Sequence, residues 1–297
     1  MKRFFNILFY LSIIIFVIYL TQIDYLVFSD IQINYWYLGL AIMFLWAGFY
    51  FSTQSWWYAL KIHKIHVSRK TGLISHGLSI FAKYIPGKVW VIIGRASYVA
   101  KDSAISGRES SIVSLKEQLI YILWGLIISF FPLLKLDNAW YIPWIIFFTI
   151  IGIALFLFFK PLHELISKLM LKWFKKEINI PLLSLKGTAK ISGFIILYWA
   201  LWIIGFFFLL KTMGIADALI ASFIFPVSVV YGILAIIIPG GIGVREGIIV
   251  SFLSLMGCDL ATATSFSILS RLWFITGEVF IFLISLLAKS IKKQTYL

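Results

Sequence analysis

Six apolar runs, each close to the length of a membrane-crossing helix, dominate this sequence. They occupy residues 4–20, 35–60, 112–132, 140–159, 190–210 and 262–288. About 20 residues of α-helix cross the roughly 30 Å hydrocarbon core of a bilayer. Hydrophobic residues make up 62% of the 297 residues, against about 45–50% in soluble domains. The sequence therefore predicts an all-α polytopic membrane protein, and it excludes a soluble enzyme and a disordered chain.

Two further apolar segments, residues 71–100 and 217–257, are interrupted by proline and glycine. The interruptions lie at Pro86-Gly87 and at Pro239-Gly240-Gly241-Ile242-Gly243. Proline cannot continue a helix, and glycine permits any backbone turn. The pieces on either side are too short to cross a bilayer, so we expect two broken or re-entrant helical hairpins. The predicted fold is six full spans plus these two hairpins, or up to eight crossings, within a single transmembrane domain over residues 1–297.

The basic residues predict the orientation of these spans. All but four of the 26 Lys and Arg residues fall on one side of the alternating loops, beginning with Lys2 and Arg3. The exceptions are Lys135 and Lys211, in the opposite loops, and Arg245 and Arg271, inside apolar sequence. Cytoplasmic loops of membrane proteins carry the excess of basic residues. We read the first run as an uncleaved span, and both termini are therefore expected in the cytoplasm. The net charge of +14 reports this topology and does not indicate nucleic acid.

The two hairpins share a pattern of Pro-Gly, a short apolar stretch and then arginine. By the loop count the first enters from the cytoplasm and the second from outside. Two broken hairpins with opposite entry sides are typical of an inverted repeat around a site near the middle of the membrane. Unwound backbone at that depth is tolerated only where protein or a water-filled cavity surrounds it. The sequence therefore suggests an inverted repeat.

Ionisable residues within the apolar segments are the candidates for a binding site. Arg245 and Glu246 open a helix directly after Gly243, and a helix N-terminus with an arginine suits a phosphate. Two other pairs stand seven residues apart and share a helical face, Lys88 with Arg95 and Arg271 with Glu278. Glu117 begins the third span. One interpretation brings these residues together in one lipid-binding cavity, and the alternative is that they only pair with one another and hold the helices together.

The sequence contains no motif that indicates a bound cofactor or metal. Cys258 is the only cysteine, so a cysteine-built metal site is excluded. His63 and His66 lie next to basic residues at the end of a span, where an interfacial role is expected. The stretch from Pro239 to Gly247 lacks the Lys-Ser/Thr pair of a nucleotide-binding P-loop. We therefore predict no cofactor, no metal and no catalytic residue, so any driving force is an ion gradient, a lipid gradient or a partner.

Two sequence motifs resemble signatures of a known family. They are Lys83-Tyr84-Ile85-Pro86-Gly87-Lys88-Val89-Trp90, followed by Gly94-Arg95, and Pro239-Gly240-Gly241-Ile242-Gly243-Val244-Arg245-Glu246-Gly247. Both resemble the transmembrane region of lysylphosphatidylglycerol synthase, which also occurs in stand-alone flippase-like proteins. The resemblance covers essentially the whole chain. It implies movement of a lipid between leaflets of a bacterial inner membrane. We expect a stand-alone member without the soluble aminoacyltransferase domain of the full-length synthases, so the resemblance does not imply a lipid aminoacyltransferase.

The leading functional hypothesis is therefore a translocase for an anionic phospholipid or a lipid-linked glycan intermediate. Two alternatives stay open: an integral-membrane transferase acting on a lipid carrier, and an accessory subunit of a glycosyltransferase or exporter. The expected partners are membrane lipid and a cell-envelope glycosyltransferase or synthase, and homo-oligomerisation is left open. The predicted substrate-binding residues are Pro86, Gly87, Lys88, Arg95, Glu117, Pro239, Gly240, Gly241, Gly243, Arg245, Glu246, Arg271 and Glu278.

Overall fold

The computed structural model shows helices connected by short loops. It describes residues 33–85, 89–103, 105–134, 140–162, 164–165, 168, 185–236 and 238–294. Five helices in these ranges are long and apolar enough to cross a membrane. They are α2 (Tyr35–Ile62), α5 (Gly107–Leu133), α6 (Tyr141–Phe158), α8 (Leu185–Thr212) and α12 (Leu260–Gln294). These five match the predicted runs after the first one. The predicted span at 4–20 lies outside the described residues.

Both broken segments form short helices on either side of their Pro-Gly positions. The first contains α3 (Arg69–Leu78), the 3₁₀ helix η1 (Ile80–Tyr84) and α4 (Val89–Asp102). The second contains α9 (Ala218–Ser222), α10 (Ile224–Leu234), the 3₁₀ helix η3 (Pro239–Gly241) and α11 (Val244–Leu255). In the first segment the Thr71 hydroxyl donates to Asp102 Oδ2 at 3.0 Å. That bond joins the start of α3 to the end of α4, so this segment doubles back as a hairpin.

Polar residues at the helix ends explain where the long helices begin. The Asn34 side chain accepts from the N–H of Trp36 at 3.1 Å at the start of α2. Ser106 and Glu109 form a reciprocal capping box at the start of α5, which satisfies two backbone donors that the helix leaves open. Asp259 accepts from the Thr262 N–H at 2.9 Å before α12. This hydrogen bond lowers the pKa of the Asp259 carboxyl, which lies outside the spans.

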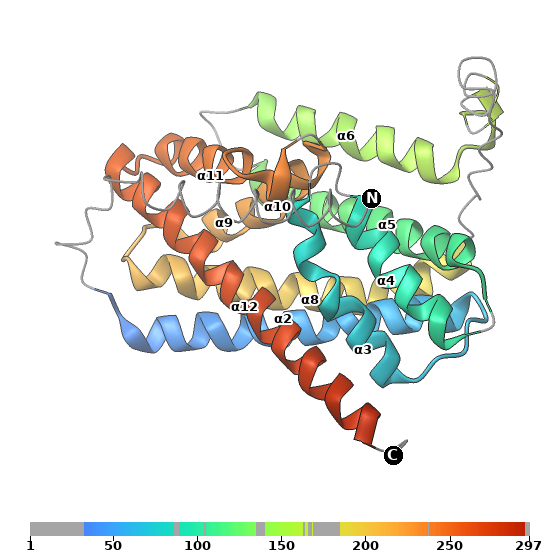
Figure 1. Ribbon diagram of the computed structural model, residues 1–297. Helices are drawn as coiled ribbons and strands as arrows, with labels where there is room; N and C mark the ends of the chain where they lie inside the picture. The colour runs from blue at the N-terminus through green and yellow to red at the C-terminus, as the bar shows by residue number, and fades with distance from the viewer. Residues whose placement is uncertain are drawn as a thin grey trace.

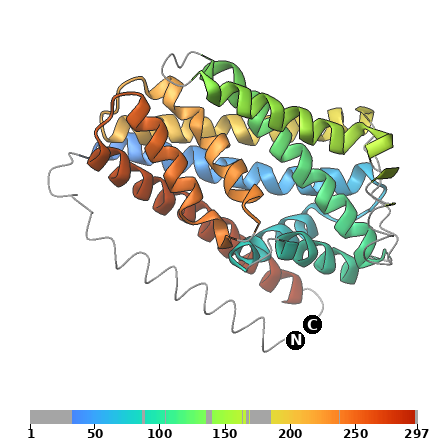
Figure 2. The same ribbon diagram turned by 90° about the horizontal axis from the view of Figure 1, so that it is seen from above.

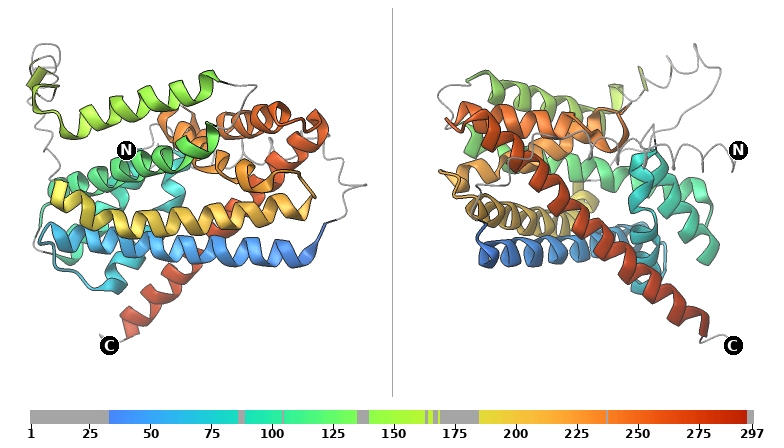
Figure 3. Two further views of the ribbon diagram at one scale, coloured as in Figure 1. Left: turned by 180° about the vertical axis from the view of Figure 1, so that it is seen from behind. Right: turned by 60° about the vertical axis from the view of Figure 1, so that its left-hand side comes forward.

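Helices α2 and α8 lie side by side along most of their length, and α12 crosses them obliquely (Figure 1). The Asn34 N–H donates to the Thr212 carbonyl at 3.3 Å, so the start of α2 meets the end of α8 and the two run antiparallel. Helix α6 packs on α5 at the edge of the bundle. The C-terminal end of α12 extends beyond its neighbours (Figure 3).

Apart from the short helix α9, which precedes α10 in the second half, the elements of the two halves follow one order: long helix, short helix, 3₁₀ turn, short helix, long helix. In the first half these are α2, α3, η1, α4 and α5, and in the second they are α8, α10, η3, α11 and α12. Each half also packs on the other in the same way, since α3 contacts α12 and α10 contacts α5. The corresponding first helices run antiparallel, which is the relation that an inverted repeat requires.

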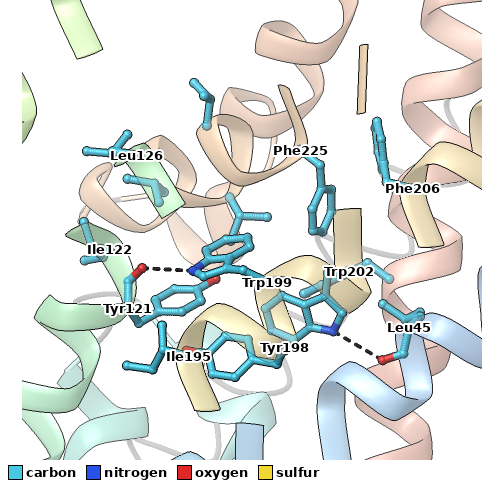
Figure 4. Close-up of a cluster of buried hydrophobic side chains, with 14 of the residues drawn as sticks. Leu45, Tyr121, Ile122, Leu126, Ile195, Tyr198, Trp199, Trp202, Phe206 and Phe225 are labelled. Carbon is cyan, nitrogen blue, oxygen red and sulfur yellow. Dashed lines mark hydrogen bonds between the residues drawn. The ribbon is translucent and has the colours of Figure 1, made fainter. Parts of the chain in front are cut away.

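A cluster of buried aromatic rings fills the centre of the bundle (Figure 4). The Tyr121 and Trp199 rings stack with centroids 4.7 Å apart, and the Trp199 indole N–H donates to the Tyr121 carbonyl at 3.1 Å. The Trp202 indole N–H donates to the Leu45 carbonyl at 3.2 Å. Buried indole groups need such partners. These contacts fix α8 against α5 and α2, which gives the charged residues of the hairpins a rigid frame.

Gly125 on α5 lets three helices approach closely. A Cβ atom at this position would lie 2.7 Å from Trp199 Cζ2 and 3.0 Å from Val230 Cγ2. We therefore expect Gly125→Ala to destabilise the protein by about 1–3 kcal/mol, the usual cost of overpacking. Gly193→Ala on the exposed face of α8 is the matched control, because nothing lies within 4 Å of its Cβ position. Thermal unfolding of both purified variants measures the difference. Equal unfolding temperatures would contradict the close packing at Gly125.

Candidate charged site

The two broken segments meet at their turns, where η1 contacts η3 (Figure 2). The Tyr84 ring packs over Gly240, whose φ is +59°. A Cβ at Gly240 would lie 2.6 Å from two atoms of that ring and 3.0 Å from Arg271 Nη2. Glycine is therefore required at residue 240 both by the left-handed backbone and by the close approach. This contact brings residues that are more than 150 positions apart in the chain into one cluster.

The 3₁₀ helix η1 of the first broken segment is bound to α12 through Glu278. Lys83 forms an ion pair with Glu278 Oε1, and the Tyr84 hydroxyl donates to Glu278 Oε2 at 2.9 Å. The Glu278 side chain is fully buried, whereas Lys83 is partly exposed. A buried carboxylate is stable only when cations and hydrogen-bond donors surround it. Glu278 therefore serves as the anchor of the first hairpin on the last helix.

The 3₁₀ helix η3 and the start of α11, in the second broken segment, are bound to α12 through Arg271. Its Nη1 lies 3.5 Å from Glu246 Oε1 and donates to the Gly240 carbonyl at 3.2 Å. Glu246 Oε2 in turn accepts from the Gly243 N–H at 2.7 Å. Glu246 therefore caps the start of its own helix, α11, and pairs with α12 at the same time.

Arg245 differs from the other buried cations. Its side chain is only 5% exposed, and its Nε has no hydrogen-bond partner among the described residues. No carboxylate of the described chain lies within ion-pair distance of it. Its guanidinium lies over the Phe274 ring, 4.5 Å from the centroid, and 5.8 Å from that of Phe225. A cation over a ring gains up to about 2 kcal/mol, which is less than the several kcal/mol lost on burial of an ion.

Arg95 and Glu117 form a separate pair between α4 and α5. Arg95 Nη2 lies 2.8 Å from Glu117 Oε2, and the guanidinium also donates to the hydroxyl and carbonyl of Ser114 at 2.6 and 2.7 Å. The Ser55 hydroxyl donates to Glu117 Oε1 at 3.0 Å. Arg95 also lies over the Trp56 ring, 4.3 Å from its centroid. The polar atoms of this pair are thus engaged with the protein itself.

The structure places most of the predicted site residues in one of these two groups. Gly240, Arg245, Glu246, Arg271 and Glu278 gather where the turns meet, with Pro239, Gly241 and Gly243 in the adjoining backbone. Arg95 and Glu117 lie in the second group. Pro86, Gly87 and Lys88 fall outside the described residues.

The structure also shows partners that helical spacing does not indicate. Arg271 and Glu278 share a helical face, but the structure pairs Arg271 with Glu246 and Glu278 with Lys83, because the turns of the hairpins bring closer partners. Two glycine N–H groups of the second turn are likewise bound within the protein. The Gly243 N–H donates to Glu246, and the Gly241 N–H donates to the Ile238 carbonyl at 3.2 Å.

Sequence reasoning missed two members of the cluster as site residues, Lys83 and Tyr84. Both precede Pro86 within an apolar stretch, and a lysine in such a setting is itself a signal of function. Phe274 was also missed, and nothing in the sequence distinguishes it from the other apolar residues of the last span. No three His, Cys, Asp or Glu side chains of the described ranges gather as metal ligands would.

Helices of spanning length and buried charges at broken turns define a multi-pass α-helical membrane protein. The family described as the lysylphosphatidylglycerol synthase TM region matches residues 4–277. Because the match covers most of the chain, the protein belongs to this family. No curated protein and no solved structure matches it.

Proposed function

We propose that the protein is a lipid translocase, which moves an anionic phospholipid or lipid-linked glycan intermediate between the leaflets of a bacterial inner membrane. The family takes its name from a synthase of lysylphosphatidylglycerol, itself a phospholipid, which places the protein in lipid-related processes. The observation that carries the proposal is the buried Arg245 guanidinium, which has no anionic partner in the described chain. A phosphate group bound there would supply that partner with two parallel hydrogen bonds.

The arrangement of the two halves supports alternating exposure of this site. Apart from α9 the halves repeat one order of elements, their first helices are antiparallel, and their turns meet at the charged cluster. In transporters built from inverted repeats, one repeat rocks against the other around a fixed site. Here the bonds of Lys83 and Tyr84 to Glu278 join the halves, so these bonds would break and re-form during transport. The lipid tails would stay in the bilayer while the head group crosses.

The test is transport by the purified chain alone in proteoliposomes. The probe is phosphatidylglycerol labelled on one acyl chain, whose outer-leaflet fraction is bleached by a membrane-impermeant reductant. We expect vesicles containing the protein to expose label from the inner leaflet, and protein-free vesicles to keep it protected. Protection equal to that of protein-free vesicles would contradict the translocase and favour an accessory subunit. Chemical conversion of an added lipid carrier would instead favour a transferase.

The proposed topology makes a separate prediction. The loop at residues 63–68 should be cytoplasmic and the loop at 213–217 external. Lys61, Lys64, Arg69 and Lys70 lie in or next to the first loop, whereas Lys211 alone lies next to the second, and cytoplasmic loops carry the excess of basic residues. Lys64→Cys and Asp217→Cys, each in a Cys258→Ser background, place a single thiol in each loop. We expect an impermeant maleimide to label only the Asp217→Cys protein in intact cells and both proteins after lysis. Labelling of the Lys64→Cys protein in intact cells would overturn the orientation and the cytoplasmic termini.

A further inference from the structure

The charges in the cluster do not cancel. Counted at their formal charges, three cations, Lys83, Arg245 and Arg271, stand with two carboxylates, Glu246 and Glu278. The remaining described carboxylates of the chain are exposed, apart from that of Glu117, which is paired with Arg95. The cluster therefore holds an excess of one positive charge within the described residues.

The contacts assign that excess to Arg245. Lys83 pairs with Glu278, and Arg271 pairs with Glu246. Arg245 is left with the faces of Phe225 and Phe274. The two carboxylates are close enough to act on its charge, but neither lies within ion-pair distance. An anion bound to Arg245 would therefore also lie near the negative charges of Glu246 and Glu278.

These neighbours limit the charge of the anion. One negative charge balances Arg245 and leaves the cluster neutral. Within the described residues no further cation of the cluster is left to meet a second negative charge, which would face Glu246 and Glu278. Like charges placed together in a binding site are strongly unfavourable. A phosphodiester carries one charge at neutral pH, whereas a phosphomonoester carries about 1.5 to 2.

We propose that this site selects a head group with a single negative charge, as a phosphodiester has, and that Glu246 and Glu278 set the limit. This inference rests on the proposed function and narrows its substrate class. Phosphodiester lipids are accepted, and lipids that end in a phosphomonoester or a diphosphate are disfavoured. Arg245 supplies the attraction, and the two carboxylates exclude the second charge.

Binding of two lipids with identical acyl chains to the full-length protein in phosphatidylcholine nanodiscs tests the inference. Phosphatidylglycerol is the monoanionic probe. Phosphatidic acid is the second probe, because its terminal phosphate changes from one charge toward two as the pH rises through about 6. We expect phosphatidic acid to bind like phosphatidylglycerol near pH 5 and to lose affinity about tenfold or more by pH 8. Phosphatidylglycerol should change little over the same range and thereby controls for titration of the protein.

Carboxamide variants then test which residues set the limit. Glu246→Gln and Glu278→Gln each remove one negative charge while keeping the shape and an acceptor oxygen. In either variant, phosphatidic acid at pH 8 should bind nearly as well as phosphatidylglycerol. The inference is overturned if wild-type protein binds both lipids equally at pH 8, or if neither variant changes their ratio.

The same measurement separates this inference from the proposed function. Equal binding of both lipids that is lost in Arg245→Gln would overturn charge selection and leave the translocase site in place. Arg245→Gln binding phosphatidylglycerol like the parent would overturn the site itself, and with it both proposals.

Discussion

Arg245→Ala is expected to weaken binding and transport of phosphatidylglycerol by about tenfold or more, while the protein keeps its stability. The loss follows from the charge-assisted hydrogen bond that the head group would make, about 1.5–3 kcal/mol, because 1.4 kcal/mol corresponds to a factor of ten. Stability is retained because no carboxylate of the described chain depends on Arg245 as its partner. Binding to nanodiscs and thermal unfolding of the same preparations measure the two effects.

Arg245→Lys provides the matched comparison. Lysine retains the charge but loses the planar fork of donors that fits a phosphate, so we expect affinity between those of the parent and the alanine variant. A sharp fall in unfolding temperature for Arg245→Ala, with lipid binding unchanged, would show that the guanidinium holds the helices together. That outcome would place the accessory-subunit hypothesis ahead of the translocase.

The long helices could be predicted from hydropathy, but their ends could not. The run at 190–210 is part of a longer described helix, Leu185–Thr212, because Lys186 is compatible with the helix although it lowers the local hydropathy. At the edge of a membrane, a long basic side chain can keep its stem on apolar surface and its charged end in water. Helix α5 likewise begins at Gly107, five residues before its apolar run, because of the capping box at Ser106. A capping box in α5 and a basic side chain in α8, rather than hydropathy, account for the helical residues outside these two apolar runs.

The site was predictable in its members but not in its pairing. Arg and Glu residues are energetically costly inside a membrane and are therefore rare and conspicuous in apolar sequence. The sequence could thus identify four charged residues of the cluster, in the second hairpin and the last helix: Arg245, Glu246, Arg271 and Glu278. Their partners could not be identified in this way, since the Lys83–Glu278 pair joins residues 195 positions apart. Helical spacing indicates which side chains share a face but carries no information about which turn packs against that face. That information comes from the contact of η1 with η3.

Helical spacing likewise does not indicate the partner of Arg95. The sequence groups Arg95 with the phosphate-binding residues, and the structure pairs it with Glu117. Both side chains are buried, at 1% and 4% exposure. Removing one partner of a buried pair leaves the other charge uncompensated, at a cost of about 3–5 kcal/mol. We therefore expect Arg95→Ala and Glu117→Ala each to lower stability by about that amount, measured by thermal or denaturant unfolding. The effect contrasts with that of Arg245→Ala, which removes a charge without such a partner.

Replacing both members of the pair distinguishes a structural role from a ligand-binding one. Arg95→Met combined with Glu117→Leu removes both charges and keeps apolar volume between α4 and α5, and such exchanges are often neutral or stabilising. The double variant should therefore be more stable than either alanine variant, and it should bind phosphatidylglycerol like the parent. If it folds normally but binds the lipid about tenfold more weakly, Arg95 contacts the head group. The binding site would then extend from Arg245 in the second hairpin to Arg95 in the first, as the sequence alone suggested.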